Sequence, residues 1–106
     1  MSTDISVIEL EKRLKSGEQI NLIDVREVYE YEEFNLGGKL IPLGELPGKL
    51  DDIEDLKDQE VVVHCRSGMR SNSAKQFLMQ SGFSNVRNLI GGVLDWQAHF
   101  GPDSQP

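Results

Sequence analysis

The stretch from Val61 to Ser71 constrains the fold more than any other part of this 106-residue chain. It begins with three consecutive valines and reaches the only cysteine of the sequence, Cys65. A short β-branched run bounded by polar residues predicts a buried strand. Residues 71–78 then place apolar side chains at positions i, i+3 and i+4, which predicts a helix with one buried face. We therefore expect the thiol on a tight turn between the end of a buried strand and the start of a helix.

This position favours a reactive thiolate. The first N–H groups of a helix have no partner within the helix, and together with the helix dipole they attract anions. Arg66 and Arg70 add two positive charges close to Cys65 in the sequence. Because the thiolate is the reactive form of cysteine, these features predict a lowered pKa and a nucleophilic Cys65. The alternative is a buried structural cysteine that behaves as a small apolar side chain.

The rest of the chain alternates between strand and helix patterns. Further strands are expected at residues 20–25 and 86–89, with a short one after Gly38. Helices are expected at residues 6–15, 28–34 and 51–57, and a last one opens at Val93. This alternation predicts an α/β fold, with a mostly parallel central sheet of about five strands and helices on both faces.

The first predicted helix carries a start signal, because Ser6 and Glu9 have the spacing of a capping box. The apolar side chains that this helix is expected to bury are Ile8, Leu10 and Leu14. Residues 43–50 are expected to form a loop with at most one helical turn.

Charge is distributed unevenly along the chain. The formal net charge is −7, which argues against nucleic acid as a partner. Residues 1–60 hold 16 acidic and 7 basic side chains, whereas residues 61–106 hold 2 acidic and 4 basic ones. The positive part of the chain includes Cys65, and a local positive field suits a small anionic substrate.

Length and composition predict a single domain over residues 1–106, with its core at about residues 4–100 and a frayed tail at 101–106. No apolar run approaches the length of a membrane helix, so no membrane partner is expected, and the first four residues lack the features of a signal peptide. One cysteine cannot form an internal disulfide, which favours a reducing, cytoplasmic setting. The two histidines are far apart and no Cys/His cluster occurs, so we expect no metal site, and we expect no cofactor.

Three motifs resemble those of the rhodanese family of sulfurtransferases. They are Asp24-Val25-Arg26 after a strand, residues 65–71 around the cysteine, and residues 91–96 with the sequence Gly-Gly-Val-Leu-Asp-Trp. The resemblance covers nearly the whole length and is to the single-domain thiosulfate sulfurtransferase type. One departure lies at residues 35–42, where the family usually has a His-Ile-Pro-Gly-Ala-like sequence. This chain has Asn35, Leu36 and two glycines there, so no histidine can act at that point.

The resemblance implies sulfur transfer through a persulfide on Cys65. The thiolate would take the outer sulfur of a donor such as thiosulfate, release sulfite, and pass the sulfur to cyanide or a thiol. Asp24 and Arg26 would support the site by holding neighbouring loops. The residues expected to bind the substrate are Arg66, Ser67, Gly68, Met69, Arg70 and Ser71. The expected partners are a small anionic sulfur donor, a thiol or cyanide acceptor and a candidate sulfur-relay protein.

Two other functions fit part of the sequence. A persulfide carrier or docking module for a protein partner would use the same Cys65, so the sequence does not separate it from an enzyme. A cysteine phosphatase or arsenate reductase of related fold would also place His-Cys before an anion-binding loop, as His64 and Cys65 do here. Such enzymes carry an arginine six positions after the cysteine, whereas here Ser71 holds that position and Arg70 comes at five. The shorter loop favours one persulfide sulfur over a phosphate.

Overall fold

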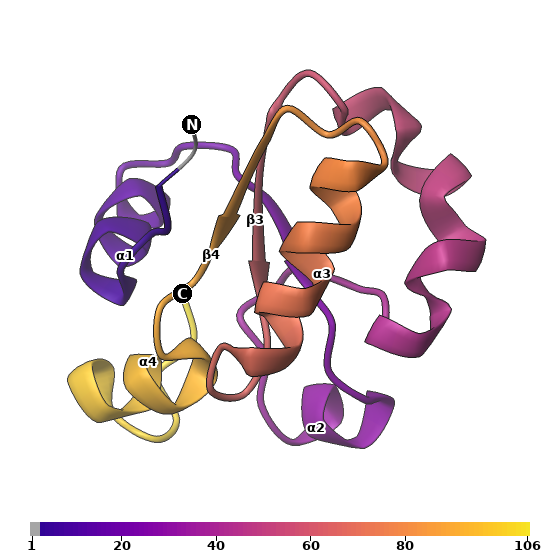
Figure 1. The fold of residues 1–106 in the computed structure, drawn as a ribbon. Helices are drawn as coiled ribbons and strands as arrows, with labels where there is room; N and C mark the ends of the chain where they lie inside the picture. The colour runs from indigo at the N-terminus through magenta and orange to yellow at the C-terminus, as the bar shows by residue number, and fades with distance from the viewer. Residues whose placement is uncertain (1–2) are drawn as a thin grey trace.

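A parallel four-stranded sheet forms the centre of the computed structural model, which describes residues 3–106 (Figure 1). Its strand order is β2-β1-β3-β4. The strands are β1 (Asn21–Asp24), β2 (Lys39–Leu40), β3 (Glu60–His64) and β4 (Asn85–Asn88). The α/β fold with a parallel sheet is confirmed, but within the described part of the chain the sheet has four strands and not the five expected. Besides these strands, Ile5 makes an isolated parallel bridge to Leu89.

Helices cover both faces of the sheet, as the sequence predicts. They are α1 (Val7–Lys15), α2 (Val28–Glu33), the 3-10 helix η1 (Leu43–Leu56), α3 (Met69–Gln80) and α4 (Gly92–Phe100). In Figure 1, α1 and α4 lie on one side of the sheet, and α3 lies on the other. In the described part of the chain, no helix is both long and apolar enough to span a membrane.

The three valines of β3 pack on both faces of the sheet. Val61 and Val63 join a core cluster that includes Ala74 of α3 and Leu46 of η1. Val62 joins the cluster on the other face, which includes Leu10 and Trp96. Successive side chains of a strand point to opposite faces, so a central strand of a two-sided sheet needs apolar residues at every position.

Helix α1 begins where the sequence signal places it, since Ser6 Oγ accepts a hydrogen bond from the Glu9 N–H at 3.1 Å. The expected burial of Leu10 is confirmed, but Ile8 is 52% exposed. The buried face instead runs through Val7 and Leu10, three positions apart, and Ile8 lies next to that face.

The segment from Leu43 to Leu56 differs from the expectation of a loop followed by a short helix. It is helical from Leu43 onward, with non-helical backbone angles at Lys49 and Ile53. Leu46 is fully buried in the core. Packing of this side chain holds the first part of the segment in a helical conformation, an effect of tertiary structure that local sequence does not reveal.

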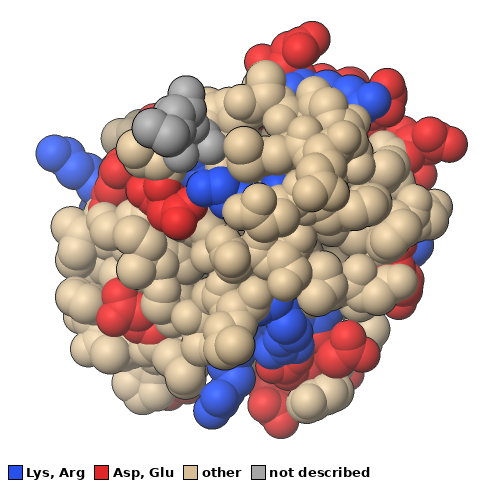
Figure 2. Space-filling model, in the orientation of Figure 1, with Lys and Arg blue, Asp and Glu red and all other residues tan. Residues whose placement is uncertain are grey.

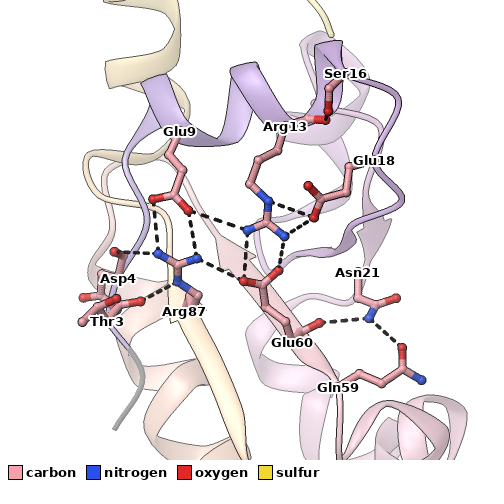
Figure 3. A network of polar contacts seen from close by, with 10 residues as sticks. All are labelled: Thr3, Asp4, Glu9, Arg13, Ser16, Glu18, Asn21, Gln59, Glu60 and Arg87. Atoms are coloured by element: carbon pink, nitrogen blue, oxygen red, sulfur yellow. Dashed lines mark hydrogen bonds and ion pairs between the residues drawn. The ribbon is translucent and has the colours of Figure 1, made fainter.

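A network of charged residues joins α1, β3 and β4 at the amino-terminal end of β3 (Figure 3). Glu60, the first residue of β3, accepts hydrogen bonds at 3.0 Å from both Arg13 and Arg87. Glu9 and Glu18 complete the network, with Glu9 bound to Arg87 and Glu18 to Arg13. Since Cys65 follows the other end of β3, this network is structural and lies away from the thiol.

Residues 101–106, which we expected to be frayed, contact the body of the fold in this structure. Trp96 Nε1 donates a hydrogen bond to the carbonyl of Ser104 at 2.6 Å. Gln105 Nε2 donates another to the carbonyl of Asn35 at 3.1 Å. Residues 1 and 2, which belong to the predicted single domain, lie outside the described residues.

Candidate active site

Cys65 lies at the carboxyl edge of the sheet, directly after β3. In the strand registers, Asp24 of β1 pairs with His64 and Asn88 of β4 pairs with Val63. The ends of three neighbouring strands therefore bring Asp24, Cys65 and Asn88 to one edge. In open α/β sheets this edge is where ligands bind.

Three donors converge on the sulfur atom of Cys65. The Gly68 N–H lies at 3.1 Å from Sγ, the Ser71 N–H at 3.4 Å and the Ser71 hydroxyl at 3.3 Å. Gly68 has φ +110°, a value that side-chain-bearing residues rarely adopt, and it directly precedes α3. Helix α3 starts at Met69, so Met69 and Arg70 belong to its first turn and the connecting loop is shorter than the sequence predicts.

These donors set the acidity of the thiol. Burial raises the pKa of Cys65, but hydrogen bonds from the Ser71 hydroxyl and from the Ser71, Gly68 and Ser67 N–H groups lower it, and the pKa ends below its usual range. The direction agrees with the sequence prediction. The expected N–H groups at the start of the helix are among the causes, together with the Ser71 hydroxyl, which the sequence did not indicate.

Arg66 of the loop and Arg70 of the first turn of α3 have unequal surroundings. Arg70 makes a bidentate ion pair with Glu30 of α2, with N–O distances of 2.7 and 2.9 Å. This contact lowers the pKa of the Glu30 carboxyl to about 2. Arg66 is exposed, and no ion pair involves it within residues 3–106. The sequence places both arginines near the thiol but does not indicate that one of them is already bound by a carboxylate.

The amino terminus of α4 fixes the loop from the other side. The Val93 N–H donates to the Cys65 carbonyl and the Leu94 N–H to the Arg66 carbonyl, both at 3.0 Å. A Cβ atom on Gly92 would lie 2.5 Å from the Cys65 carbonyl oxygen, closer than side-chain atoms come. Gly92 therefore lets the free N–H groups of a helix approach the loop backbone.

A cavity of about 510 Å³ opens beside the loop. Its walls come from α2, the loop, the start of α3 and α4, and they include Tyr29, Glu33, Arg66, Arg70 and Leu94. The thiol lies under the loop, since Cys65 is only 1% exposed. Within residues 3–106, no group of three His, Cys, Asp or Glu side chains comes together as a metal site would require.

Comparison with known proteins agrees with this geometry. The chain matches the family described as Rhodanese-like domain over residues 6–99. It belongs to the rhodanese-like domain family. A protein of Allochromatium vinosum named sulfurtransferase is 36% identical over 100 residues, which cover 93% of this chain and 92% of that protein.

Two further relatives are similar to most of this chain. The putative sulfur carrier protein YrkF of Bacillus subtilis is 34% identical over 88% of this chain, which spans only 50% of YrkF. The solved structure of the human single-domain sulfurtransferase TSTD1 superposes with a TM-score of 0.77 at 28% identity, covering 90% of this chain and 95% of that one.

Asp24 and Arg26 form a buried ion pair in this rhodanese-like domain. Arg26 donates from Nε and Nη2 to the Asp24 carboxylate, with the shortest contact at 2.8 Å. Arg26 Nη2 also donates to the carbonyl of Phe34 at 2.7 Å. The pair thus joins the end of β1 to the end of α2, and its support of the site stays a prediction.

Sequence reasoning did not find Asn88. Its Oδ1 accepts a hydrogen bond from the Ser71 hydroxyl at 2.6 Å, so the single hydroxyl proton is shared between this oxygen and the Cys65 sulfur, and its Nδ2 donates to the Gly68 carbonyl at 3.1 Å. Asn88 therefore contacts both residues that donate to the Cys65 sulfur. The sequence does show a polar residue, Asn88, at the end of a buried strand. Its position beside the Cys65 loop follows only from the sheet order, which places β4 next to β3.

His64 is the second residue whose environment the sequence does not reveal. It is fully buried, and neither ring nitrogen has a hydrogen-bond partner in the described part of the chain. Its Nε2 lies 3.8 Å from Asp24 Oδ2. Burial lowers the pKa of His64 to about 4, so the ring is neutral near pH 7.

Proposed function

We propose that this rhodanese-like domain is a sulfurtransferase that carries sulfane sulfur as a persulfide on Cys65. The observation that carries the proposal is the convergence of the Gly68 N–H, the Ser71 N–H and the Ser71 hydroxyl on one sulfur atom. Such preorganised donors stabilise a thiolate before reaction and the charge that develops during it. The relatives named sulfurtransferase or sulfur carrier support the same general chemistry.

The first half-reaction begins with the Cys65 thiolate. It attacks the outer sulfur of thiosulfate, a new S–S bond forms, and the old S–S bond breaks with its electron pair leaving on sulfite. The persulfide places its outer sulfur about 2 Å beyond Sγ, farther from the buried position of the thiol. Arg66, the exposed arginine beside the loop, binds the sulfonate end of the donor.

The second half-reaction returns the enzyme to its starting state. Cyanide or a thiolate attacks the outer sulfur, and the Cys65 thiolate leaves with the electron pair of the S–S bond. The loop donors stabilise this leaving thiolate as they stabilised the nucleophile. Asp24 and Arg26 act in both steps by holding the end of α2 at the cavity. A single free thiol suits a reducing, cytoplasmic setting.

The loop also bears on the phosphatase alternative. Ser71, which stands at the position of the phosphatase arginine, is fully buried, and its hydroxyl contacts the thiol. Arg70 is bound to Glu30. Neither the sixth nor the fifth position after Cys65 therefore offers a free arginine that could complete a phosphate-sized ring, and we expect no hydrolysis of an aryl phosphate.

Intact-mass measurement after incubation with thiosulfate tests the proposal. Wild-type protein is expected to gain the mass of one sulfur on Cys65, and a Cys65→Ser variant to gain none while keeping its circular dichroism spectrum. Thiocyanate formation from thiosulfate and cyanide is expected to disappear in the same variant. Residual transfer near the wild-type rate in Cys65→Ser would overturn the mechanism. A persulfide carrier would form the same adduct but turn over slowly with cyanide.

A further inference from the structure

Exposed apolar side chains gather around the opening of the Cys65 site. Among residues 3–106, seven large apolar side chains are exposed, and four of them flank the site. These four, here called the apolar rim, are Tyr29 (64% exposed), Met69 (80%), Ile90 (54%) and Leu94 (42%). Single exposed apolar residues are ordinary, but a cluster beside a reactive group indicates a contact surface.

Backbone and cavity contacts locate the rim. Met69 follows Gly68, which donates to the Cys65 sulfur. Ile90 lies between Leu89 and Gly91, whose backbone atoms approach Gly68. Tyr29 and Leu94 line the same cavity as the loop arginines. The rim therefore draws on α2, α3, α4 and the segment before α4.

The size of the rim excludes a small molecule as its sole occupant. Met69 and Ile90 do not line the cavity, although they are among the most exposed apolar residues of the described chain. A thiosulfate or cyanide ion inside the cavity would leave both side chains in water. Only an occupant that extends over the surface would cover them.

Charged residues beside the apolar rim indicate which kind of partner would bind there. Glu27, Glu32 and Glu33, at α2 and its amino-terminal cap, are exposed, and no ion pair involves them within residues 3–106. Figure 2 shows acidic side chains beside basic ones where Figure 1 places α2. Three carboxylates outside any ion pair, against the one cavity guanidinium outside any ion pair, that of Arg66, favour a partner with a basic surface.

We propose that the apolar rim docks a protein whose acceptor thiol lies among apolar and basic side chains. The proposal rests on the persulfide chemistry of the proposed function and adds the partner class. Docking brings the partner thiolate to the outer sulfur of the Cys65 persulfide. The thiolate forms a new S–S bond, the bond to Cys65 Sγ breaks, and its electron pair stays on the Cys65 thiolate. The partner leaves as a persulfide, and no external oxidant or reductant is consumed.

The test compares two thiols that share one reacting group. The first is N-acetylcysteine amide, and the second is a blocked peptide with a single cysteine flanked by leucines and lysines. Cys65 is first loaded with sulfur from thiosulfate, and the persulfide is quantified by intact mass. Transfer rates are then measured and expressed per thiolate. We expect the peptide to react at least about tenfold faster, since contact with the rim raises its local concentration.

Matched variants connect this preference to the rim. Ile90 and Ile8 are 54% and 52% exposed, but only Ile90 belongs to the rim. Ile90→Ser is expected to lower the peptide rate by about threefold or more and to leave the N-acetylcysteine amide rate unchanged, while Ile8→Ser changes neither. Met69→Ser and Met79→Ser, on the same helix, form a second pair. Met69→Ser is expected to lower the ratio of the peptide rate to the N-acetylcysteine amide rate, and Met79→Ser to leave this ratio unchanged. Replacing the peptide lysines by glutamates is expected to slow its reaction.

The outcomes separate the two proposals. If the persulfide forms but the two thiols react at equal rates, or if Ile90→Ser behaves as Ile8→Ser does, the docking surface is wrong and the sulfurtransferase proposal stands. If no persulfide forms on Cys65, both proposals fail. A glutamate peptide that reacts faster than the lysine peptide would overturn the assignment of a basic partner.

Discussion

Glu30 binds Arg70 through both carboxylate oxygens, at 2.7 and 2.9 Å, and so joins α2 to the first turn of α3. Bidentate pairs of this kind hold both side chains in fixed positions. The pair neutralises a guanidinium that the sequence suggests for binding an anionic donor. Arg66 is left as the free cation of the cavity, which limits the attraction of a doubly charged donor such as thiosulfate.

We expect the activity with thiosulfate to increase when the Glu30–Arg70 ion pair is broken. Glu30→Gln removes one negative charge from the cavity and releases Arg70, so kcat/KM with thiosulfate is expected to rise roughly three- to tenfold. Glu32→Gln is the matched control, because it removes an exposed charge from the same helix without releasing Arg70, and it is expected to change the rate less. Equal effects of the two variants would show that overall charge matters and the ion pair does not.

The Glu30–Arg70 pair also marks a limit of sequence reasoning. The two residues are 40 positions apart, and their contact depends on how α2 packs against the start of α3. The contact of Ser71 with Cys65, by contrast, follows from a strand, a tight turn and a helix that are adjacent in sequence. Local patterns thus predicted the thiol and its donors, while tertiary packing decided which arginine is free.

The hydroxyl of Ser71 is expected to control the ionisation of Cys65. Ser71→Ala removes the largest of the contributions that lower the thiol pKa, so this pKa rises and the thiolate fraction at neutral pH falls. Loss of one hydrogen bond to a charged group lowers sulfur transfer about tenfold. Iodoacetamide alkylation across a pH series measures the shift directly. Ser73→Ala, an exposed site on the same helix, is the control, and an unshifted profile in Ser71→Ala would refute the role of the hydroxyl.

Gly92 is expected to be essential for the position of the loop. A Cβ atom there would lie 2.5 and 2.6 Å from the carbonyl oxygens of Cys65 and Arg66, which are themselves bound by α4. Gly92→Ala must therefore displace the loop or the helix, with a loss of at least about 2 kcal/mol in the free energy of unfolding and most of the activity. Gly44→Ala meets no atom within 4 Å and is the control for urea unfolding and thiocyanate formation. Wild-type stability in Gly92→Ala would contradict this packing.

The two glycines at the start of α4 illustrate which structural features a sequence pattern predicts and which it does not. The sequence predicts a last helix that opens at Val93, after two glycines, and the helix starts one residue earlier, at Gly92, with Gly91 as its N-cap. The reason for the glycine at position 92 was not apparent, because it lies in a contact with residues 65 and 66, far away along the chain.

Because His64 is buried, we expect the protein to lose stability in mild acid. Its pKa is lowered from 6.5 to about 4 in the folded protein, mainly by burial. Between these values the unfolded chain binds a proton that the folded protein does not, so the free energy of unfolding falls as the pH falls. From about pH 7 to about pH 5 this single group accounts for a loss of about 2 kcal/mol.

Urea unfolding at the two pH values measures that loss. Most carboxylates titrate below this pH range, so they contribute little to the change in the free energy of unfolding. A His64→Leu variant has no titrating group at this position and is expected to lose about 2 kcal/mol less than wild type between the two pH values. His99→Gln, which alters an exposed histidine, is expected to keep the wild-type dependence. If His64→Leu and wild type lost the same stability, the neutral, unpaired state of His64 would be incorrect.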